Sequence, residues 1–231
     1  MTRLGELTAG LAAVEHRLRA ACAAAGRGRT EVTLIAVGKT RPAADLRGLA
    51  GLGVRDFAEN RDQEARSKAA QLSDLGLRWH FVGRLQTNKC RSVAGYADLV
   101  HSVDRLELVR ALGRGAGRAG RQLEVLLQVS LDDDPARGGA PAAAVPALAD
   151  AIAAEEHLRL GGVMAVAPVA ADAVSAFERL ATVAALVRAA HPGATAVSAG
   201  MSADLEAAIA AGATHVRIGT ALFGGRSPIL G

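Results

Sequence analysis

Apolar residues recur along this chain with a helical period in some segments and a strand-like period in others. Residues 3–25 carry Leu and Val at spacings of three and four, which predicts an amphipathic helix that ends at Gly26 and Gly28. Beyond this helix, short apolar runs alternate with longer segments of helical spacing. The short runs predict strands near residues 32–38, 54–58, 79–83, 98–102, 123–131, 160–166, 195–199 and 215–218. The longer segments predict helices near residues 42–51, 60–73, 86–95, 104–117, 141–156, 172–190 and 202–211.

The alternation of strands and helices defines the expected fold class. Strands separated by helices form a parallel sheet with crossover connections, and the eight strands predicted here are the number that closes a (β/α)8 barrel. We therefore predict an α/β fold, a TIM barrel with one extra N-terminal helix, as a single domain over residues 1–231. The competing fold is an open doubly wound sheet, but no G-x-G-x-x-G sequence follows the first predicted strand.

The composition argues against nucleic-acid binding. Half of the 231 residues are apolar, so a large core can be buried, and the aromatic content of 3% is too low for stacking platforms. The net charge of +4 comes mainly from scattered arginines. The densest group of them is Arg110, Arg114, Arg118 and Arg121. Their spacing is typical of a solvated helix face and turn.

No segment predicts export, a membrane span or a metal site. The first residues lack the apolar stretch of a signal peptide, and no window reaches the about 18 uninterrupted apolar residues of a membrane span. Cys22 and Cys90 lack zinc-site spacing and are typical of reduced thiols. The run Asp132-Asp133-Asp134 lacks the glycine and distal glutamate of a calcium loop, so we interpret it as a solvated loop. We expect a soluble, cytoplasmic protein.

Lys39 is the first candidate for chemistry. It follows the apolar run 32–38 and precedes a polar turn, so it stands at the C-terminal end of the first predicted strand. Barrel enzymes carry their reactive groups at this end of their strands. Side chains alternate along a strand, so Lys39 shares a face with Val37 and Ile35. If that face is the barrel interior, the amine points into the mouth, where partial burial lowers its proton affinity and lets it condense with an aldehyde.

Two late segments have the pattern of phosphate sites. In Ser198-Ala199-Gly200-Met201-Ser202, Gly200 lets the backbone approach a ligand, and Ser202 is a good N-cap for the helix that runs to Ala211. The alternative is an ordinary capped helix, and Asp204 and Glu206 in its first turn would repel phosphate unless they project toward solvent.

The second segment is Arg217-Ile218-Gly219-Thr220. If Val216 and Ile218 pack under the helices, Arg217 points into the barrel and needs an acceptor there. Gly219 and Thr220 supply backbone N–H groups and a hydroxyl at the top of the last strand, and loops after strands seven and eight are the usual phosphate site of this barrel. A lysine amine together with a phosphate cradle indicates pyridoxal 5′-phosphate (PLP).

Further motifs strengthen this interpretation. They are Ala36-Val37-Gly38-Lys39-Thr40, Phe57-Ala58-Glu59-Asn60 with Gln63-Glu64, Trp79-His80-Phe81-Val82-Gly83 with Leu85-Gln86 and Asn88-Lys89, Gly200-Met201-Ser202 with Asp204-Leu205-Glu206, and Arg217-Ile218-Gly219-Thr220 with Phe223-Gly224. With them the chain resembles, over nearly its whole length, the pyridoxal phosphate homeostasis family, stand-alone relatives of the alanine racemase N-terminal barrel.

The resemblance implies specific roles for eight residues. Lys39 would carry PLP as a Schiff base, the phosphate would lie at Ser202, Gly219 and Thr220, and Arg217 would face the pyridine nitrogen. Asn60, Met164 and Ser198 would line the pocket. The chain departs from the family pattern at Gly38, Ala58, Arg61 and Arg137, where Ser, Gly, Tyr and Lys are common.

The resemblance also implies a carrier of PLP that maintains its intracellular supply and acts without robust catalysis. An arginine beside the pyridine nitrogen disfavours protonation of the ring and weakens it as an electron sink. Racemisation in the larger relatives needs a tyrosine from an added β-domain. This chain ends soon after the eighth predicted strand, and its single tyrosine, Tyr96, falls in or beside the predicted helix 86–95.

The alternatives are a PLP-dependent amino-acid racemase or related fold-type III enzyme, and a class I aldolase that uses Lys39 on a sugar phosphate. The expected partners are PLP and recipient apo-enzymes, and the default oligomeric state is a monomer. His80 is expected to be a hydrogen-bonded core histidine rather than a proton-transfer residue.

Overall fold

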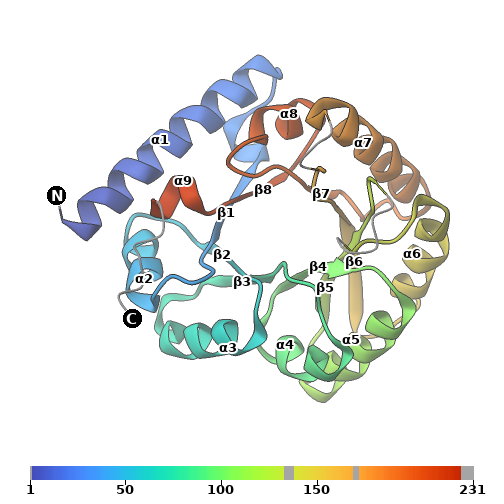
Figure 1. Cartoon of the computed structure of the whole chain (residues 1–231). Helices are drawn as coiled ribbons and strands as arrows, with labels where there is room; N and C mark the ends of the chain where they lie inside the picture. The colour runs from blue at the N-terminus through green and yellow to red at the C-terminus, as the bar shows by residue number, and fades with distance from the viewer. Residues whose placement is uncertain (1, 133–137, 169–171, 225–231) are drawn as a thin grey trace.

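The structure is a computed structural model that describes residues 2–132, 138–168 and 172–224. Its eight strands form a closed barrel in the order β1 to β8, and each strand is parallel to its neighbours, β8 pairing with β1 (Figure 1). The strands are β1 (Thr33–Val37), β2 (Asp56–Glu59), β3 (Arg78–Phe81), β4 (Leu99–Val103), β5 (Leu123–Gln128), β6 (Leu158–Met164), β7 (Ala196–Ser198) and β8 (His215–Ile218). The predicted barrel is confirmed.

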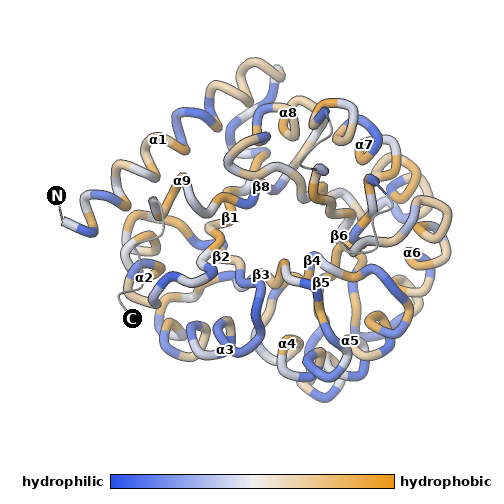
Figure 2. Tube along the Cα trace, in the orientation of Figure 1, coloured by the Kyte–Doolittle hydropathy of each residue, from blue (hydrophilic) through white to orange (hydrophobic). Residues whose placement is uncertain are grey.

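The helices surround the barrel, and α1 lies outside the ring that the others form (Figure 1). They are α1 (Arg3–Ala24), α2 (Ala43–Gly51), α3 (Asp62–Gln71), α4 (Cys90–Tyr96), α5 (Leu106–Arg118), α6 (Val145–Ala153), α7 (Ala173–Ala190), α8 (Leu205–Ala210) and α9 (Thr220–Phe223). Figure 2 shows polar and apolar residues interleaved along these helices, as expected where one side packs on the sheet. No helix within the described ranges has the length and apolar character that a membrane crossing requires.

Alternate strand residues face two different cores. Val216 and Ile218 of β8 belong to a buried cluster shared with Leu7 and Leu18 of α1, so they face outward under the helices. A smaller cluster inside the barrel consists of Leu99, Leu126, Met164 and Ala196, from strands β4 to β7. Residues between the outward-facing ones therefore project into the barrel, as the sequence predicted for Arg217.

The extra helix α1 braces the place where the barrel closes. A Cβ atom on Gly10 would lie 2.5 Å from the carbonyl oxygen of Leu222, so only glycine allows α1 to approach α9 this closely. Arg3 donates a hydrogen bond of 3.0 Å to the carbonyl oxygen of Phe223, also in α9. Arg27, just beyond α1, donates to the carbonyl oxygens of Ile209 and Ala213. The helix thus fixes the segments after β7 and β8.

Several predicted element boundaries differ from the structure, and one element was missed. The predicted strand 123–131 ends at Gln128, because Val129 forms a bridge to Ala140 and the backbone N–H of Ser130 donates to the Ala140 carbonyl. The predicted helix 202–211 begins only at Leu205. The short helix α9 was not predicted.

The cysteine prediction agrees with the structure, whereas part of the acidic run is not described. Cys22 and Cys90 are buried free thiols, and burial raises the pKa of Cys90 to about 11. Asp133, Asp134 and Arg137 lie outside the described residues.

Candidate functional site

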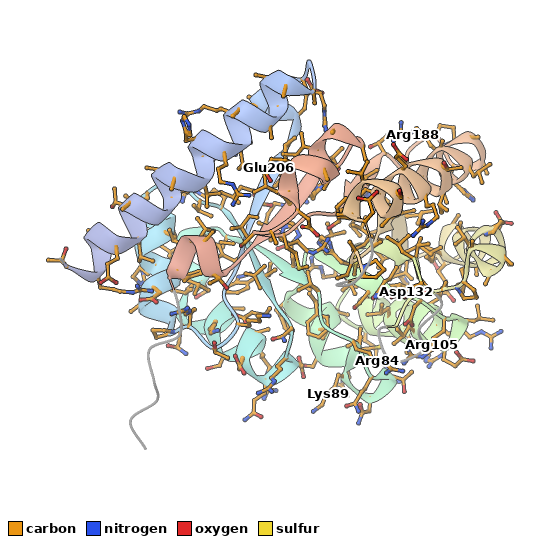
Figure 3. The ribbon with its side chains drawn as sticks, turned by 45° about the horizontal axis from the view of Figure 1, so that its top comes forward. Arg84, Lys89, Arg105, Asp132, Arg188 and Glu206 are labelled. Carbon is orange, nitrogen blue, oxygen red and sulfur yellow. The ribbon has the colours of Figure 1, made fainter. Side chains whose placement is uncertain are left out.

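Lys39 directly follows β1 at the C-terminal end of the barrel and is exposed. Lysine occurs at only three positions in the chain, 39, 68 and 89. Lys68 is buried in an ion pair, and Lys89 is exposed on the far side of the molecule from α1 (Figure 3). Lys39 is therefore the one exposed lysine that the barrel places at a strand end.

A buried ion pair supports the backbone just before Lys39. The Nζ atom of Lys68 donates to the carbonyl oxygen of Gly38 over 2.8 Å and to Glu59 Oε1 over 2.6 Å. Glu59 has no exposed surface, and its Oε2 atom has no hydrogen-bond partner among the described residues. Burial raises the pKa of Glu59, and the hydrogen bond and charge of Lys68 only partly oppose this. Lys68 thus compensates a costly buried carboxylate while it holds the Gly38 carbonyl.

Thr40, on the other side of Lys39, has an unusual backbone. Its φ angle is 64°, in the left-handed region that a β-branched residue rarely adopts. The Thr40 N–H donates to Glu64 Oε2 over 3.2 Å, and the Arg41 N–H donates to the Gly38 carbonyl over 3.0 Å. These contacts hold a tight turn, as the sequence predicted, and strained backbone of this kind is concentrated at functional sites.

Arg217 is a buried cation on β8, the strand that pairs with β1. It lies on β8, in register with Ile35 of β1, and is only 5% exposed. Its Nη1 donates to Ser198 Oγ over 2.6 Å and its Nη2 to the Ala165 carbonyl over 2.9 Å. Burial lowers its pKa to about 10, so it stays cationic at neutral pH. The sequence predicted that Arg217 needs an acceptor, and the Ser198 hydroxyl and the Ala165 carbonyl fill this role. They use two of the five N–H donors of the guanidinium.

Two histidines connect Ser198 to the other end of the barrel. His101 Nδ1 lies 2.9 Å from Ser198 Oγ, and His101 Nε2 lies 2.9 Å from His80 Nδ1. His80 Nε2 lies 2.9 Å from Asp56 Oδ1. Burial is the main cause that lowers the pKa of His101 well below its ordinary value, so this ring is neutral. His80 is 1% exposed and hydrogen-bonded through both nitrogens, which agrees with the predicted core histidine.

The segment after β7 forms a turn rather than a helix cap. Gly200 has a φ angle of 90°, and a Cβ atom there would lie 2.7 Å from that of Ala208. The Met201 N–H donates to Asp204 Oδ1 over 2.6 Å, which closes a turn before α8. Ser202 is half-buried in this turn, so the prediction that it caps the helix was wrong; Asp204 occupies the N-cap position.

The α1 helix holds this turn from outside. Arg17 Nη1 donates to the Ser202 carbonyl over 2.9 Å, and its other nitrogens bind Glu206 at 2.9 and 3.0 Å. Figure 3 shows Glu206 on α8, on the side where α1 lies. Glu206 is exposed, as predicted, and its charge is compensated by Arg17. The carboxylate of Asp204 is engaged by the Met201 N–H.

The remaining predicted residues lie at three places on the barrel. Gly219, half-buried, directly follows β8 and is the N-cap residue of α9, and Thr220 begins that helix and is exposed. Asn60 is exposed in the turn after β2. Met164 ends β6 and is 1% exposed, inside the barrel cluster. All eight predicted residues therefore lie in the C-terminal halves of strands or in the segments that follow them.

Several residues of this region were not found from the sequence. Lys68 follows Glu64 by four residues, which predicts an ordinary surface pair on a helix, and nothing in its spacing indicates the contact with Glu59. Asp56 has the strand spacing of Asn60, which was predicted to line the pocket, whereas no residue of the strand with His101 was predicted to face inward. Arg17 gave no signal, because its partners are 185 and 189 residues away.

Comparison with known proteins defines the class. Residues 10–227 match the family described as alanine racemase, N-terminal domain. This is the class of barrel that the fold and the lysine at the end of β1 indicated.

Curated relatives then identify the family within this class. The pyridoxal phosphate homeostasis protein of Pseudomonas aeruginosa is 43% identical over 216 residues, which cover 94% of this chain and 94% of that protein. The protein of the same name from Mycobacterium tuberculosis (strain H37Rv) is 44% identical over 244 residues, which cover 97% of this chain and 94% of that protein. Among solved structures, PipY of Synechococcus elongatus with PLP bound is 40% identical, with a TM-score of 0.76 over 84% of this chain and 93% of that one. The chain belongs to the pyridoxal phosphate homeostasis protein family.

Proposed function

We propose that this chain binds PLP at the C-terminal end of its barrel and serves PLP homeostasis as a carrier. The observation that carries the proposal is the exposed amine of Lys39 just after β1, together with the buried guanidinium of Arg217 on the adjoining strand β8. The names of the relatives and the PLP-bound structure of PipY support the choice of ligand.

The residues present fit the chemistry of this ligand. PLP supplies an aldehyde, a pyridine ring and a phosphate when bound. The amine of Lys39 would hold the ligand at its aldehyde carbon. Ser202, Gly219 and Thr220 provide hydroxyl and N–H donors in the segments after β7 and β8, the usual phosphate site of this barrel. Asn60, Met164 and Ser198 complete the proposed lining.

Arg217 supports a carrier rather than an efficient catalyst. A guanidinium only donates hydrogen bonds, so it can contact a pyridine nitrogen solely in the unprotonated state of the ring. An unprotonated ring withdraws electrons weakly and supports carbanion chemistry poorly. Tyr96 ends α4 and is half-buried with its hydroxyl enclosed, and burial strongly raises its pKa, so it is no ready base.

The wider role is proposed on the same grounds. We propose delivery of PLP to apo-enzymes by a monomer in the cytoplasm. The buried free thiols Cys22 and Cys90 support a reducing compartment.

Titration with PLP tests the proposal. We expect one equivalent of PLP to give an absorption band shifted to longer wavelength than that of free PLP, and we expect Lys39→Ala to abolish this shifted band. Lys89→Ala is the matched control, since Lys89 is also exposed, and it should retain the band. An unchanged band in Lys39→Ala would refute the site.

The same preparation separates the rival functions. A class I aldolase would show no visible chromophore as purified, in the absence of its sugar phosphate substrate. A racemase exchanges the α-hydrogen of amino acids in heavy water, and turnover at about 1 per second or faster would replace the carrier by an enzyme.

A further inference from the structure

A continuous line of hydrogen bonds crosses the barrel interior. It joins Asp56 of β2, His80 of β3, His101 of β4, Ser198 of β7 and Arg217 of β8, with donor–acceptor distances of 2.6 to 2.9 Å. Strands β4 and β7 are not neighbours in the barrel, so the contact between His101 and Ser198 runs through its interior. The two histidines and Ser198 are at most 1% exposed.

The chemistry at the two ends determines the direction of every bond. Arg217 can only donate, so Ser198 Oγ accepts from it. A carboxylate can only accept, so His80 Nε2–H donates to Asp56, whose Oδ1 also lies 3.8 Å from Arg78. A neutral His80 then has an unprotonated Nδ1, which accepts from His101 Nε2–H.

The same reasoning fixes the serine hydroxyl. With its proton on Nε2, neutral His101 has an unprotonated Nδ1 that faces Ser198 Oγ. The hydroxyl of Ser198 therefore donates to His101, and its lone pairs are left for Arg217. All four bonds point from Arg217 toward Asp56.

We propose that Asp56, His80 and His101 are positioning residues that set the direction of the Ser198 hydroxyl and so hold the Arg217 guanidinium in place. The geometry assigns the Nε2–H tautomer to both histidines. None of these three residues is among those proposed to hold the ligand, and each acts through Ser198.

One competing arrangement of these hydrogen bonds exists, in which two of them run in the opposite direction. An added proton on His80 Nδ1 would reverse the next two bonds, so that His101 donates to Ser198 and the serine proton loses its acceptor. The groups that face His101 electrostatically are His80, Arg217, His215 and Arg78, and none of them is an acid. Burial and these groups keep His101 itself neutral in either arrangement, so the cost of the reversed arrangement is the buried serine proton that is left without an acceptor. At the far end of the line Arg78 lies between two carboxylates, Asp56 at 3.8 Å and Glu124 at 3.7 Å, and Asp56 is the one that bonds His80.

The consequence for ligand binding rests on the proposed function, whereas the direction of the bonds does not. If Arg217 faces the ring of PLP, a guanidinium held through Ser198 is already placed before the ligand arrives. Loss of the direction then weakens PLP binding without removing any atom that contacts the ligand.

Nitrogen-15 NMR of the imidazole rings tests the proposal on the whole protein without PLP. At neutral pH we expect a protonated Nε2 and an unprotonated Nδ1 for both His80 and His101. A proton on Nδ1 of either ring, or on both nitrogens of His80, would overturn it.

Asp56→Ala adds a second test. Without the carboxylate both directions of the line contain the same number of hydrogen bonds, so Nδ1–H forms should appear in both rings. Asp98→Ala is the control, because Asp98 accepts from the Trp79 N–H at the neighbouring strand base but lies outside the line. Unchanged tautomers in Asp56→Ala would show that Asp56 does not set the direction.

A PLP titration of the same variants completes the design. We expect Asp56→Ala to weaken PLP binding by about threefold to tenfold, the effect of part of one hydrogen bond, and Asp98→Ala to leave it unchanged. If the wild-type protein binds no PLP, the proposed function fails while the tautomers still decide the positioning proposal. If PLP binds but the tautomers differ from those assigned, the positioning proposal fails alone.

Discussion

Lys68 Nζ lies 2.8 Å from the carbonyl oxygen of Gly38, one peptide unit before Lys39. The same atom lies 2.6 Å from Glu59 Oε1, so a single buried amine links the ends of β1 and β2. The lysine that the sequence identified as reactive is thus supported by a second lysine that the sequence did not single out.

Loss of this support should be costly. Lys68→Met leaves the Glu59 carboxylate buried without its cation, so we expect the free energy of unfolding to fall by about 3–5 kcal/mol. Urea denaturation measures this value, and Lys89→Met at an exposed site should change it by less than about 0.5 kcal/mol. Because burial already raises the pKa of Glu59, protonation at low pH should reduce the deficit. A deficit as small as that of Lys89→Met would show that the ion pair contributes nothing.

The close contact between α1 and α9 predicts that alanine is harmful at Gly10, in the contact, and harmless at Gly51, outside it. Gly10→Ala places a methyl group 2.5 Å from the Leu222 carbonyl, and we expect destabilisation by about 1–3 kcal/mol. Gly51→Ala meets no atom within 4 Å at the end of α2, and we expect a neutral effect or a gain of up to about 1 kcal/mol. Thermal unfolding of both variants checks the pair, and equal effects would contradict the close approach of α1.

Ser202 should matter for the ligand and not for the fold. Since it does not cap α8, Ser202→Ala should leave the unfolding free energy unchanged within about 0.5 kcal/mol. We expect it to weaken PLP binding by roughly 1–2 kcal/mol, the size of a hydrogen bond to a charged acceptor. Ser73→Ala, at an exposed serine that begins the short 3-10 helix after α3, is the control. Unaltered PLP affinity would remove Ser202 from the site.

The buried histidines predict how stability depends on pH. Burial is the main cause that lowers the pKa of His215 from 6.5 to about 4, and the pKa of His101 is lowered as well. Between pH 6.5 and about 4 the unfolded chain therefore binds more protons than the folded one, so the free energy of unfolding falls as the pH decreases. For His215 the loss amounts to at most about 3 kcal/mol.

Denaturation at several pH values tests this dependence. His215→Asn should flatten the decline between pH 6.5 and 4, whereas His16→Asn, at an exposed position of α1, should not. A stability that stayed constant over this range in the wild-type protein would contradict the assignment of buried neutral histidines.

The sequence predicted the barrel well because each strand and helix carries its own local pattern. It also predicted that Arg217 points inward, since Val216 and Ile218 mark the outward face. It failed at Ser202, where the Asp204 side chain bonds the Met201 N–H and delays the helix by three residues.

Other features depend on contacts that no local pattern carries. Lys68 sits at helical spacing from Glu64, yet its closer partner is Glu59, reached only when α3 packs beside β2. The link between His101 and Ser198 joins residues 97 positions apart through the barrel interior. Such contacts become visible only when the fold brings both sides together.

Borohydride reduction with peptide mapping is the most direct test of covalent PLP attachment. The protein is loaded with one equivalent of PLP and reduced, and the modified peptide is found by mass spectrometry. We predict that the added mass resides on Lys39 alone and that it disappears in Lys39→Ala. Recovery of the label on Lys68 or Lys89, or of no labelled peptide, would contradict it.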